Sequence, residues 1–201
     1  EWNDAALHAM ATTKAFVVFE KNHKALADPP DAGAERKIAR SCAALKAAAA
    51  AAGVAPPRCL MYTESDLART FYDLGHWVEQ NKATAALFCN GSYVLGGEDG
   101  ATLAYDFTDA AMRARWVARA TDAFAAGDVD GAFVDGNRNG FWSSVVESCD
   151  AATQAAWAAG LNASHRALAE TLASLAAANA TLAAPTIVTN YPTAEAMALC
   201  T

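Results

Sequence analysis

The sequence predicts an α/β fold built from parallel strand and helix repeats, either closed as a barrel or open and doubly wound. Two observations predict it. Short apolar runs without polar alternation, typical of strands covered on both faces, alternate four to five times with longer segments whose apolar residues recur at helical spacing. The apolar runs also end in carboxylate or amide residues, which parallel strands bring to a single edge of a sheet.

The first half of the chain shows this alternation clearly. Residues 2–13 resemble the end of a helix, and the run 16–19 is a strand candidate that ends at Glu20. A helix is predicted over 34–52, because its apolar residues form one stripe and Gly53 follows as a helix stop. The run 58–63 predicts a second strand, ending near Glu64.

The middle of the chain is less regular. Ser65 is suited to cap a helix whose apolar positions are Leu67, Phe71, Leu74 and Val78. Residues 85–105 include one possible strand and a glycine-rich turn, and a short strand is predicted to end at Asp106.

The remaining elements complete the alternation. Thr108 is suited to cap a helix that stops at Gly127, and residues 132–134 predict a buried strand that delivers Asp135. A long alanine-rich helix is expected over about 151–183, followed by a strand that reaches Asn190. The expectation is a single domain over 1–201, similar to a barrel and incomplete at both ends.

Composition limits the partners. The formal net charge is −7 and no basic run is present, which argues against nucleic acid or an anionic membrane as the partner. No apolar segment reaches the roughly 18 residues needed to cross a bilayer. Other chains of a larger assembly stay open as partners.

Cysteines and sequons predict a compartment. The five cysteines lack the C-x-x-C spacing of a zinc site or a redox dithiol. Three N-x-S/T sequons are candidate glycosylation sites, and together with the cysteines they favour the secretory route, so we expect a secreted protein or one in the endomembrane lumen. These sequons begin at Asn90, Asn162 and Asn179.

The predicted strand ends gather residues suited to breaking glycosidic bonds. That reaction needs one carboxyl group to protonate the leaving oxygen and another to attack or to activate water. Aromatic rings near the same ends suit the apolar faces of sugars. The alternative is that Asp106 and Asp135 only cap helices or turns. The catalytic candidates are Asp135, Asp106 and Glu64, and the candidate substrate contacts are Tyr62, Tyr105, Trp142, Asn190 and Glu20.

A calcium loop is a competing interpretation of residues 135–140, which match D-x-N-x-N-G. The bidentate glutamate of such a loop would stand where Val146 is, and Glu147 comes one residue later. One residue of slip turns a helical side chain by about 100°. We therefore predict no metal site, and the absence of nucleotide-binding and zinc-protease motifs predicts no cofactor.

The segment "YDFTDAAMRARW…AFAAGDVDGAFVDG" resembles the central part of glycoside hydrolase-type TIM barrels, which have a YDF run, a helix and a GxDGxFxDG strand. The motif covers about 32 residues, with Ala111 where proline is common. The resemblance implies a partial TIM-type barrel. It also implies that Asp135, which ends the central strand, is the nucleophile or its positional equivalent.

Two functional hypotheses result. The first is a carbohydrate-active hydrolase that cleaves glycosidic bonds with strand-end carboxylates. The second is a catalytically inactive, secreted structural or carbohydrate-binding protein on a hydrolase-like scaffold. In the resembling families the proton donor usually lies on a later strand, where this chain has Asn190. Either the donor lies in missing sequence, or Glu20, Glu64 or Asp106 takes that role, or the protein is inactive.

Overall fold

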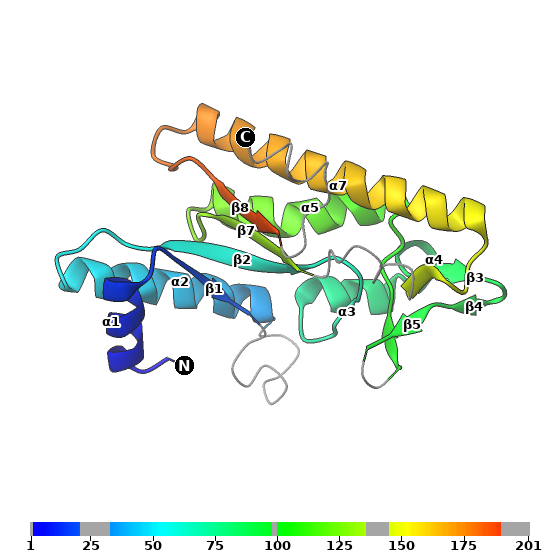
Figure 1. The fold of residues 1–201 in the computed structure, drawn as a ribbon, viewed down its shortest axis with the longest axis horizontal. Helices are drawn as coiled ribbons and strands as arrows, with labels where there is room; N and C mark the ends of the chain where they lie inside the picture. Colours follow the sequence, from blue (N-terminus) through cyan, green and yellow to red (C-terminus); the bar gives the residue numbers. More distant parts are fainter. Residues whose placement is uncertain (1, 21–32, 98–99, 136–144, 190–201) are drawn as a thin grey trace.

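The protein is an α/β fold organised on a four-stranded parallel sheet. The structure, a computed structural model, describes residues 2–20, 33–97, 100–135 and 145–189 (Figure 1). The helices described are α1 (Asp4–Thr13), α2 (Ala34–Ala51), α3 (Asp73–Gln80), α4 (Lys82–Ala85), α5 (Ala110–Ala125) and α7 (Ala151–Ala178). The strands described are β1 (Phe16–Phe19), β2 (Arg58–Glu64), β3 (Phe88–Cys89), β4 (Ser92–Tyr93), β5 (Leu95–Gly96), β6 (Thr102–Leu103), β7 (Gly131–Asp135) and β8 (Thr186–Thr189).

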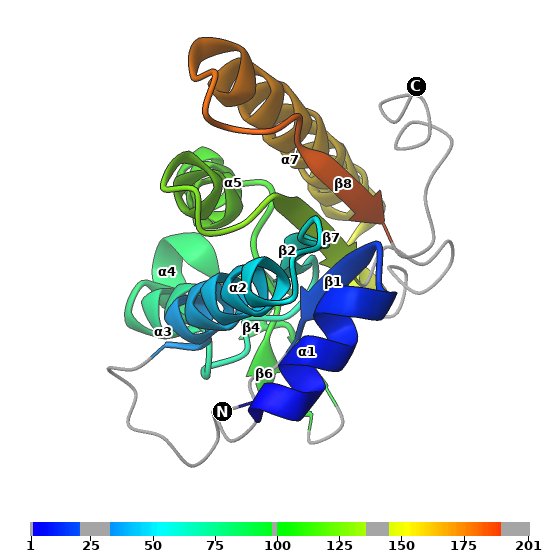
Figure 2. The ribbon, with the colours of Figure 1, turned by 90° about the vertical axis from the view of Figure 1, so that its left-hand side faces the viewer.

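The main sheet has the order β1-β2-β7-β8, and all its neighbouring strands are parallel. The helices α2, α5 and α7 follow one another along one side of this sheet (Figure 2). A core of buried apolar side chains fills the space between them. Four parallel strands in chain order establish the α/β class, and they are compatible with an open sheet as well as with part of a barrel.

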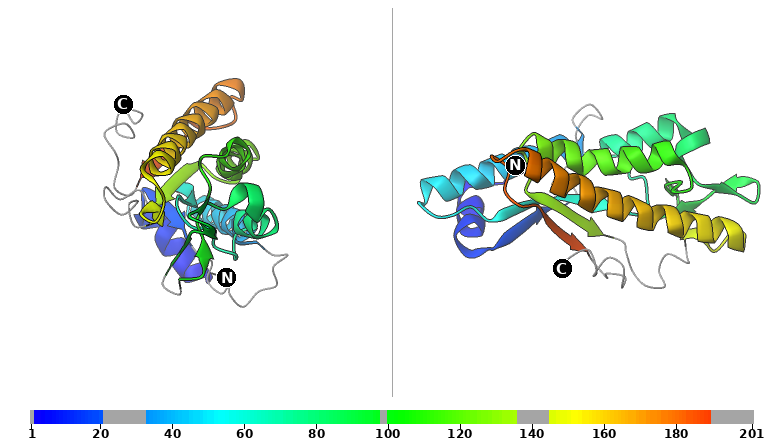
Figure 3. Two further views of the ribbon diagram at one scale, coloured as in Figure 1. Left: turned by 90° about the vertical axis from the view of Figure 1, so that its right-hand side faces the viewer. Right: turned by 90° about the horizontal axis from the view of Figure 1, so that it is seen from above.

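Glycines allow two close backbone contacts within this architecture. At Gly131, the first residue of β7, a Cβ atom would lie 1.8 Å from the carbonyl oxygen of Thr186. At Gly160, inside α7, a Cβ atom would lie 1.8 Å from the carbonyl oxygen of Phe107. Trp157 reinforces the second contact, since its indole N–H donates to the Tyr105 carbonyl at 2.7 Å. Helix α7 therefore packs directly on the loop that precedes α5 (Figure 3).

Two disulfides tie the layers together. Cys42 of α2 is bonded to Cys59 of β2, and Cys89 of β3 is bonded to Cys149 before α7. Cys200 lies outside the described residues. Among the described helices none is long and apolar enough to pass through a membrane. The two disulfides are compatible with the secreted location that the sequence predicts.

Three sequence-based expectations about the middle of the chain are wrong. No helix starts at Ser65: α3 begins only at Asp73, because the Ser65 amide and hydroxyl both bond to the Asp135 carbonyl. The segment before Asp106 is no strand of the main sheet, since β6 pairs with β5 and Tyr105 bridges to Ala86. The residue that caps α5 is Asp109, whose side chain accepts from the Met112 amide.

The last helix is also shorter than expected, since it ends at Ala178 and not near residue 183. The region that was unclear in the sequence, 85–105, forms two small antiparallel sheets, β3-β4 and β5-β6. These lie beyond the carboxyl ends of β2 and β7 (Figure 1).

Candidate functional site

Two strand-end carboxylates meet at the carboxyl edge of the sheet. Strands β2 and β7 are paired so that Glu64 stands opposite Asp135, and Tyr62 stands opposite Phe133. Residues that are paired across parallel strands, and residues two apart on one strand, point to the same face. These four side chains therefore start from one face of the sheet.

Tyr62 holds Asp135 by a short hydrogen bond. The Tyr62 hydroxyl donates to Asp135 Oδ2 at 2.7 Å. Burial, the charge of Glu64 and the bond to Asp135 raise the pKa of Tyr62 far above its usual range. The phenol therefore keeps its proton and stays a donor to this carboxylate at any physiological pH.

The backbone around these residues is fixed by further hydrogen bonds. The Ser65 amide and hydroxyl donate to the Asp135 carbonyl at 3.1 and 2.7 Å. From α5, the Trp116 indole N–H donates to the Glu64 carbonyl at 2.9 Å. The hydrogen bonding between β2 and β7 thus continues for one residue after the end of β2.

Arg69 pairs with Glu64 in the loop that replaces the expected helix. The Arg69 Nε atom lies 3.3 Å from Glu64 Oε2, and Glu64 is 7% exposed. Burial by itself would lower the pKa of Arg69, but the charge and hydrogen bond of Glu64 outweigh it and the pKa is raised. Glu64 is therefore paired with Arg69 at the edge of the sheet.

Asp66 is the residue of this site that sequence reasoning missed. It is 4% exposed, and its carbonyl accepts from the Tyr105 amide at 3.0 Å. Burial, and then the neighbouring charge of Glu64, raise the pKa of Asp66 from 3.8 to about 7; Asp135 contributes a smaller increase and Arg69 opposes it. The signal in the sequence was a carboxylate two residues after a strand-end glutamate, which the expected helix start at Ser65 concealed.

Asp106 and Glu20 were also predicted to take part in the site. Asp106 accepts from the amide and the hydroxyl of Thr108 at 2.9 and 2.6 Å, which is the turn-capping role considered as the alternative. Glu20 directly follows β1 and is exposed. Trp142 and Asn190 lie outside the described residues, as does most of the segment considered as a calcium loop.

The two tyrosines predicted to contact sugar are buried. Tyr62 is 3% exposed and Tyr105 is 0% exposed. Burial raises the pKa of Tyr105 well above its usual range, and its hydroxyl has no hydrogen-bond partner among the described residues. Among the residues that the structure describes, the exposed aromatic side chains are Phe16, Phe88 and Tyr93. Phe88 and Tyr93 contact each other edge to face on the β3-β4 hairpin.

The three sequon asparagines differ in their surroundings. Asn90 is exposed in the turn of the β3-β4 hairpin, and its side-chain amide donates to the Ser148 carbonyl. Asn162 is half-buried within α7. Asn179 is exposed just after α7, and its carbonyl oxygen accepts from the amide and hydroxyl of Thr181.

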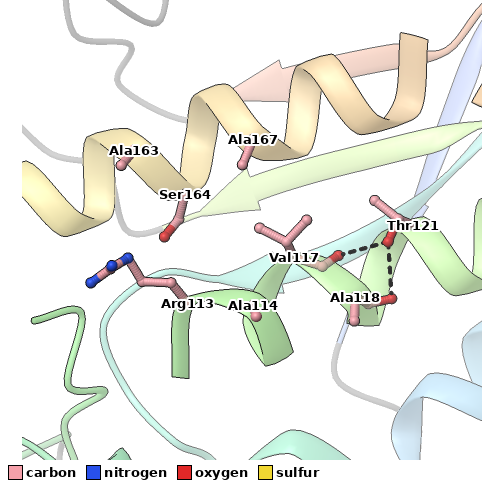
Figure 4. A pocket seen from close by; sticks show the side chains of 8 residues that line it. All are labelled: Arg113, Ala114, Val117, Ala118, Thr121, Ala163, Ser164 and Ala167. Atoms are coloured by element: carbon pink, nitrogen blue, oxygen red, sulfur yellow. Dashed lines mark hydrogen bonds between the residues drawn. The ribbon is translucent and has the colours of Figure 1, made fainter. Parts of the chain in front are cut away.

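A separate groove of about 400 Å³ runs between α5 and α7 (Figure 4). Small and apolar side chains line most of it, with Arg113 and Ser164 at one end. None of the strand-end carboxylates is part of this lining.

Neither a search for metal-binding groups nor comparison with known proteins indicates what the site does. Over the described ranges, no three or more His, Cys, Asp or Glu side chains form a group that could hold a metal ion. Comparison of the chain with protein-family models and with curated proteins finds no match.

Proposed function

We propose that this protein is a carbohydrate-active hydrolase that cleaves glycosidic bonds at the carboxyl edge of the β1-β2-β7-β8 sheet, on a scaffold that forms part of a barrel. The observation that carries the proposal is the register of Glu64 opposite Asp135, with Asp66 next to them. Two carboxyl groups in different protonation states are what glycosidic hydrolysis requires.

The surroundings of the carboxyl groups suggest their roles. Asp135 accepts a hydrogen bond from Tyr62, and such a bond favours the charged form of a carboxylate. We assign it the attack on the sugar or the activation of water. Asp66 has a pKa of about 7, so it can carry a proton near neutral pH and serve as the general acid. Glu64 is paired with Arg69, and its charge contributes to the raised pKa of Asp66.

This assignment changes two expectations from the sequence. The proton donor is Asp66, in place of Glu20, Glu64 or Asp106. Tyr62 acts as a hydrogen-bond donor to Asp135, and its buried ring is a poor platform for a sugar.

The test is hydrolysis of a panel of aryl glycosides whose leaving groups range from dinitrophenol to phenol. We expect Asp135→Asn to lose activity on every substrate. We expect Asp66→Asn to lose about 100- to 10,000-fold on phenyl glycosides and little on dinitrophenyl glycosides, because a good leaving group needs no proton. Asp122→Asn, at an exposed position of α5, is the control.

The pH dependence gives a second measurement. Since Asp66 must be protonated to act as the acid, we expect the activity of the wild type to fall as the pH rises through about 7. A wild type that binds oligosaccharides without cleaving any substrate would favour the inactive carbohydrate-binding alternative. A wild type that neither cleaves nor binds them would contradict both functions.

A further inference from the structure

A buried arginine on α5 contacts the tyrosine that holds Asp135. The side chain of Arg119 is 4% exposed, and its Nη2 donates to the Tyr62 carbonyl at 2.7 Å. Its guanidinium also lies over the ring of Tyr72, 4.9 Å from the ring centre. Arg119 thus reaches both the backbone of β2 and the ring next to it.

Aromatic rings connect Arg119 to the carboxylate of Asp135. The rings of Tyr72 and Tyr62 are stacked, with their centres 6.1 Å apart. Phe133 stacks on Tyr62 at the same distance. The Tyr62 hydroxyl then donates to Asp135 at 2.7 Å. Because the Tyr62 ring is stacked with two other rings and its carbonyl accepts from Arg119, its hydroxyl has little freedom to leave Asp135.

Glu35 lies within ion-pair distance of Arg119. Its carboxylate lies 4.0 Å from Arg119 Nη1 and accepts hydrogen bonds from the amides of Asp73 and Leu74 at 2.8 and 3.4 Å. These amides open α3, whose N-cap residue, Tyr72, provides no side-chain cap. Glu35 therefore caps a helix and serves as the counter-charge of the arginine.

Burying Arg119 with incomplete hydrogen bonding is unfavourable for the stability of the fold. Its Nε and Nη1 atoms are buried and have no hydrogen-bond partner among the described residues. A buried charge with unmet donors lowers stability compared with an apolar side chain of similar size. A role in holding Tyr62 explains why a charged group occupies this place.

We propose that Arg119 is a positioning residue that acts through the Tyr72–Tyr62 stack to keep the Tyr62 hydroxyl on Asp135. The effect on the hydrogen bond is independent of the activity, whereas the effect on catalysis rests on the proposed glycosidase function.

The first experiment needs no substrate. In NMR spectra, the Tyr62 hydroxyl proton should give a slowly exchanging signal that is absent in Tyr62→Phe. We expect Arg119→Met to make this proton exchange at least about tenfold faster, since the hydroxyl then leaves Asp135 more often. Arg119→Lys, which keeps the charge beside Glu35, should retain part of the protection.

Arg115→Met is the matched control, because Arg115 lies on the same helix and stacks on Trp77 instead. Unchanged exchange of the Tyr62 proton in a folded Arg119→Met protein would overturn the proposal. So would an equal effect of Arg115→Met. If Arg119→Met does not fold, the comparison of Arg119→Lys with the wild type decides by the same criterion.

The second experiment is a double-mutant cycle in the hydrolysis assay. We expect Arg119→Met and Tyr62→Phe each to lower kcat by about 10- to 100-fold, and the double variant to be no slower than Tyr62→Phe alone. If the double variant instead loses kcat by the product of the two single losses, Arg119 does not act through Tyr62. If the wild type shows a slowly exchanging Tyr62 hydroxyl proton and yet hydrolyses none of the substrates, that result would count against the glycosidase function only.

Discussion

Asp66 and His165 should make the stability of this protein depend on pH in opposite directions. His165 of α7 is 8% exposed next to the ring of Trp116, and burial lowers the pKa of His165 from 6.5 to about 4. The unfolded chain then binds more protons than the native state between pH 6.5 and 4, so stability is lost as the pH falls through this window. Asp66 has a raised native pKa, so its protonated form adds stability that is lost as the pH rises from about 4 to 7.

The two contributions are of similar size. One unit of pKa corresponds to 1.36 kcal/mol, so going from pH 7 to pH 5 should cost about 2 kcal/mol at His165 and gain about 2 kcal/mol at Asp66. In the wild type they largely offset each other. We therefore expect His165→Leu to be more stable at pH 5 than at pH 7, and Asp66→Asn to show the opposite order.

Urea denaturation of the two variants and the wild type at pH 5, 6 and 7 measures these differences. His8→Gln, which changes an exposed histidine of α1, is the control. Equal pH slopes for His165→Leu and the wild type would refute the burial of a neutral histidine. Equal slopes for Asp66→Asn and the wild type would refute the raised pKa of Asp66, and with it the proton donor of the proposed mechanism.

Three further predictions concern the scaffold. Gly160→Ala should lower the free energy of unfolding by more than about 2 kcal/mol, because the added Cβ would overlap the Phe107 carbonyl. Ala158→Ser, on the exposed side of α7, should change the free energy of unfolding by less than about 0.5 kcal/mol. Thermal denaturation measures both variants. Asp130→Ala should destabilise by about 1 to 3 kcal/mol, as judged by urea unfolding, since Asp130 accepts from the Cys59 amide and pairs with Lys46 at 3.1 Å; no loss would mean that water replaces both contacts. Replacing Cys42 and Cys59 by serine should cost about 3 kcal/mol, as expected for a loop of this length, and the same stability with and without a reductant would contradict the bond.

The regular elements could be predicted because their side-chain patterns agree with their tertiary surroundings. Residues 132–134 are apolar on both faces because helices and loops cover the sheet around them, and the structure places them in β7. Helix α2 was predicted to within one residue, since its stripe of Ile38, Cys42, Leu45 and Ala49 is the side that it buries. In such segments the local pattern and the fold require the same residues.

The candidate site was harder to predict because tertiary hydrogen bonds override local preference there. Ser65 is a good helix cap by type, yet both of its donors bond to the Asp135 carbonyl, 70 residues away in the sequence. That contact keeps residues 65–72 out of the helix and brings Asp66 and Arg69 next to Glu64. Asp106 failed as a strand end for a related reason, since the strand before it pairs within a separate antiparallel sheet. Long-range pairing of this kind leaves no periodic signal in a single sequence.

The two edges of the sheet treat aspartate in opposite ways, and this contrast supports a functional interpretation of the carboxyl edge. At the amino edge, Asp130 accepts a backbone amide and pairs with Lys46, which is how a structural carboxylate is stabilised. At the carboxyl edge, burial raises the pKa of Asp66, and the charge of Glu64 and, less strongly, that of Asp135 raise it further. A neutral asparagine avoids that repulsion, so Asp66→Asn should be more stable than the wild type at pH 8, where Asp66 is ionised. A gain in stability together with a loss of hydrolysis is the exchange expected of a catalytic group. A loss of both would assign Asp66 to the scaffold.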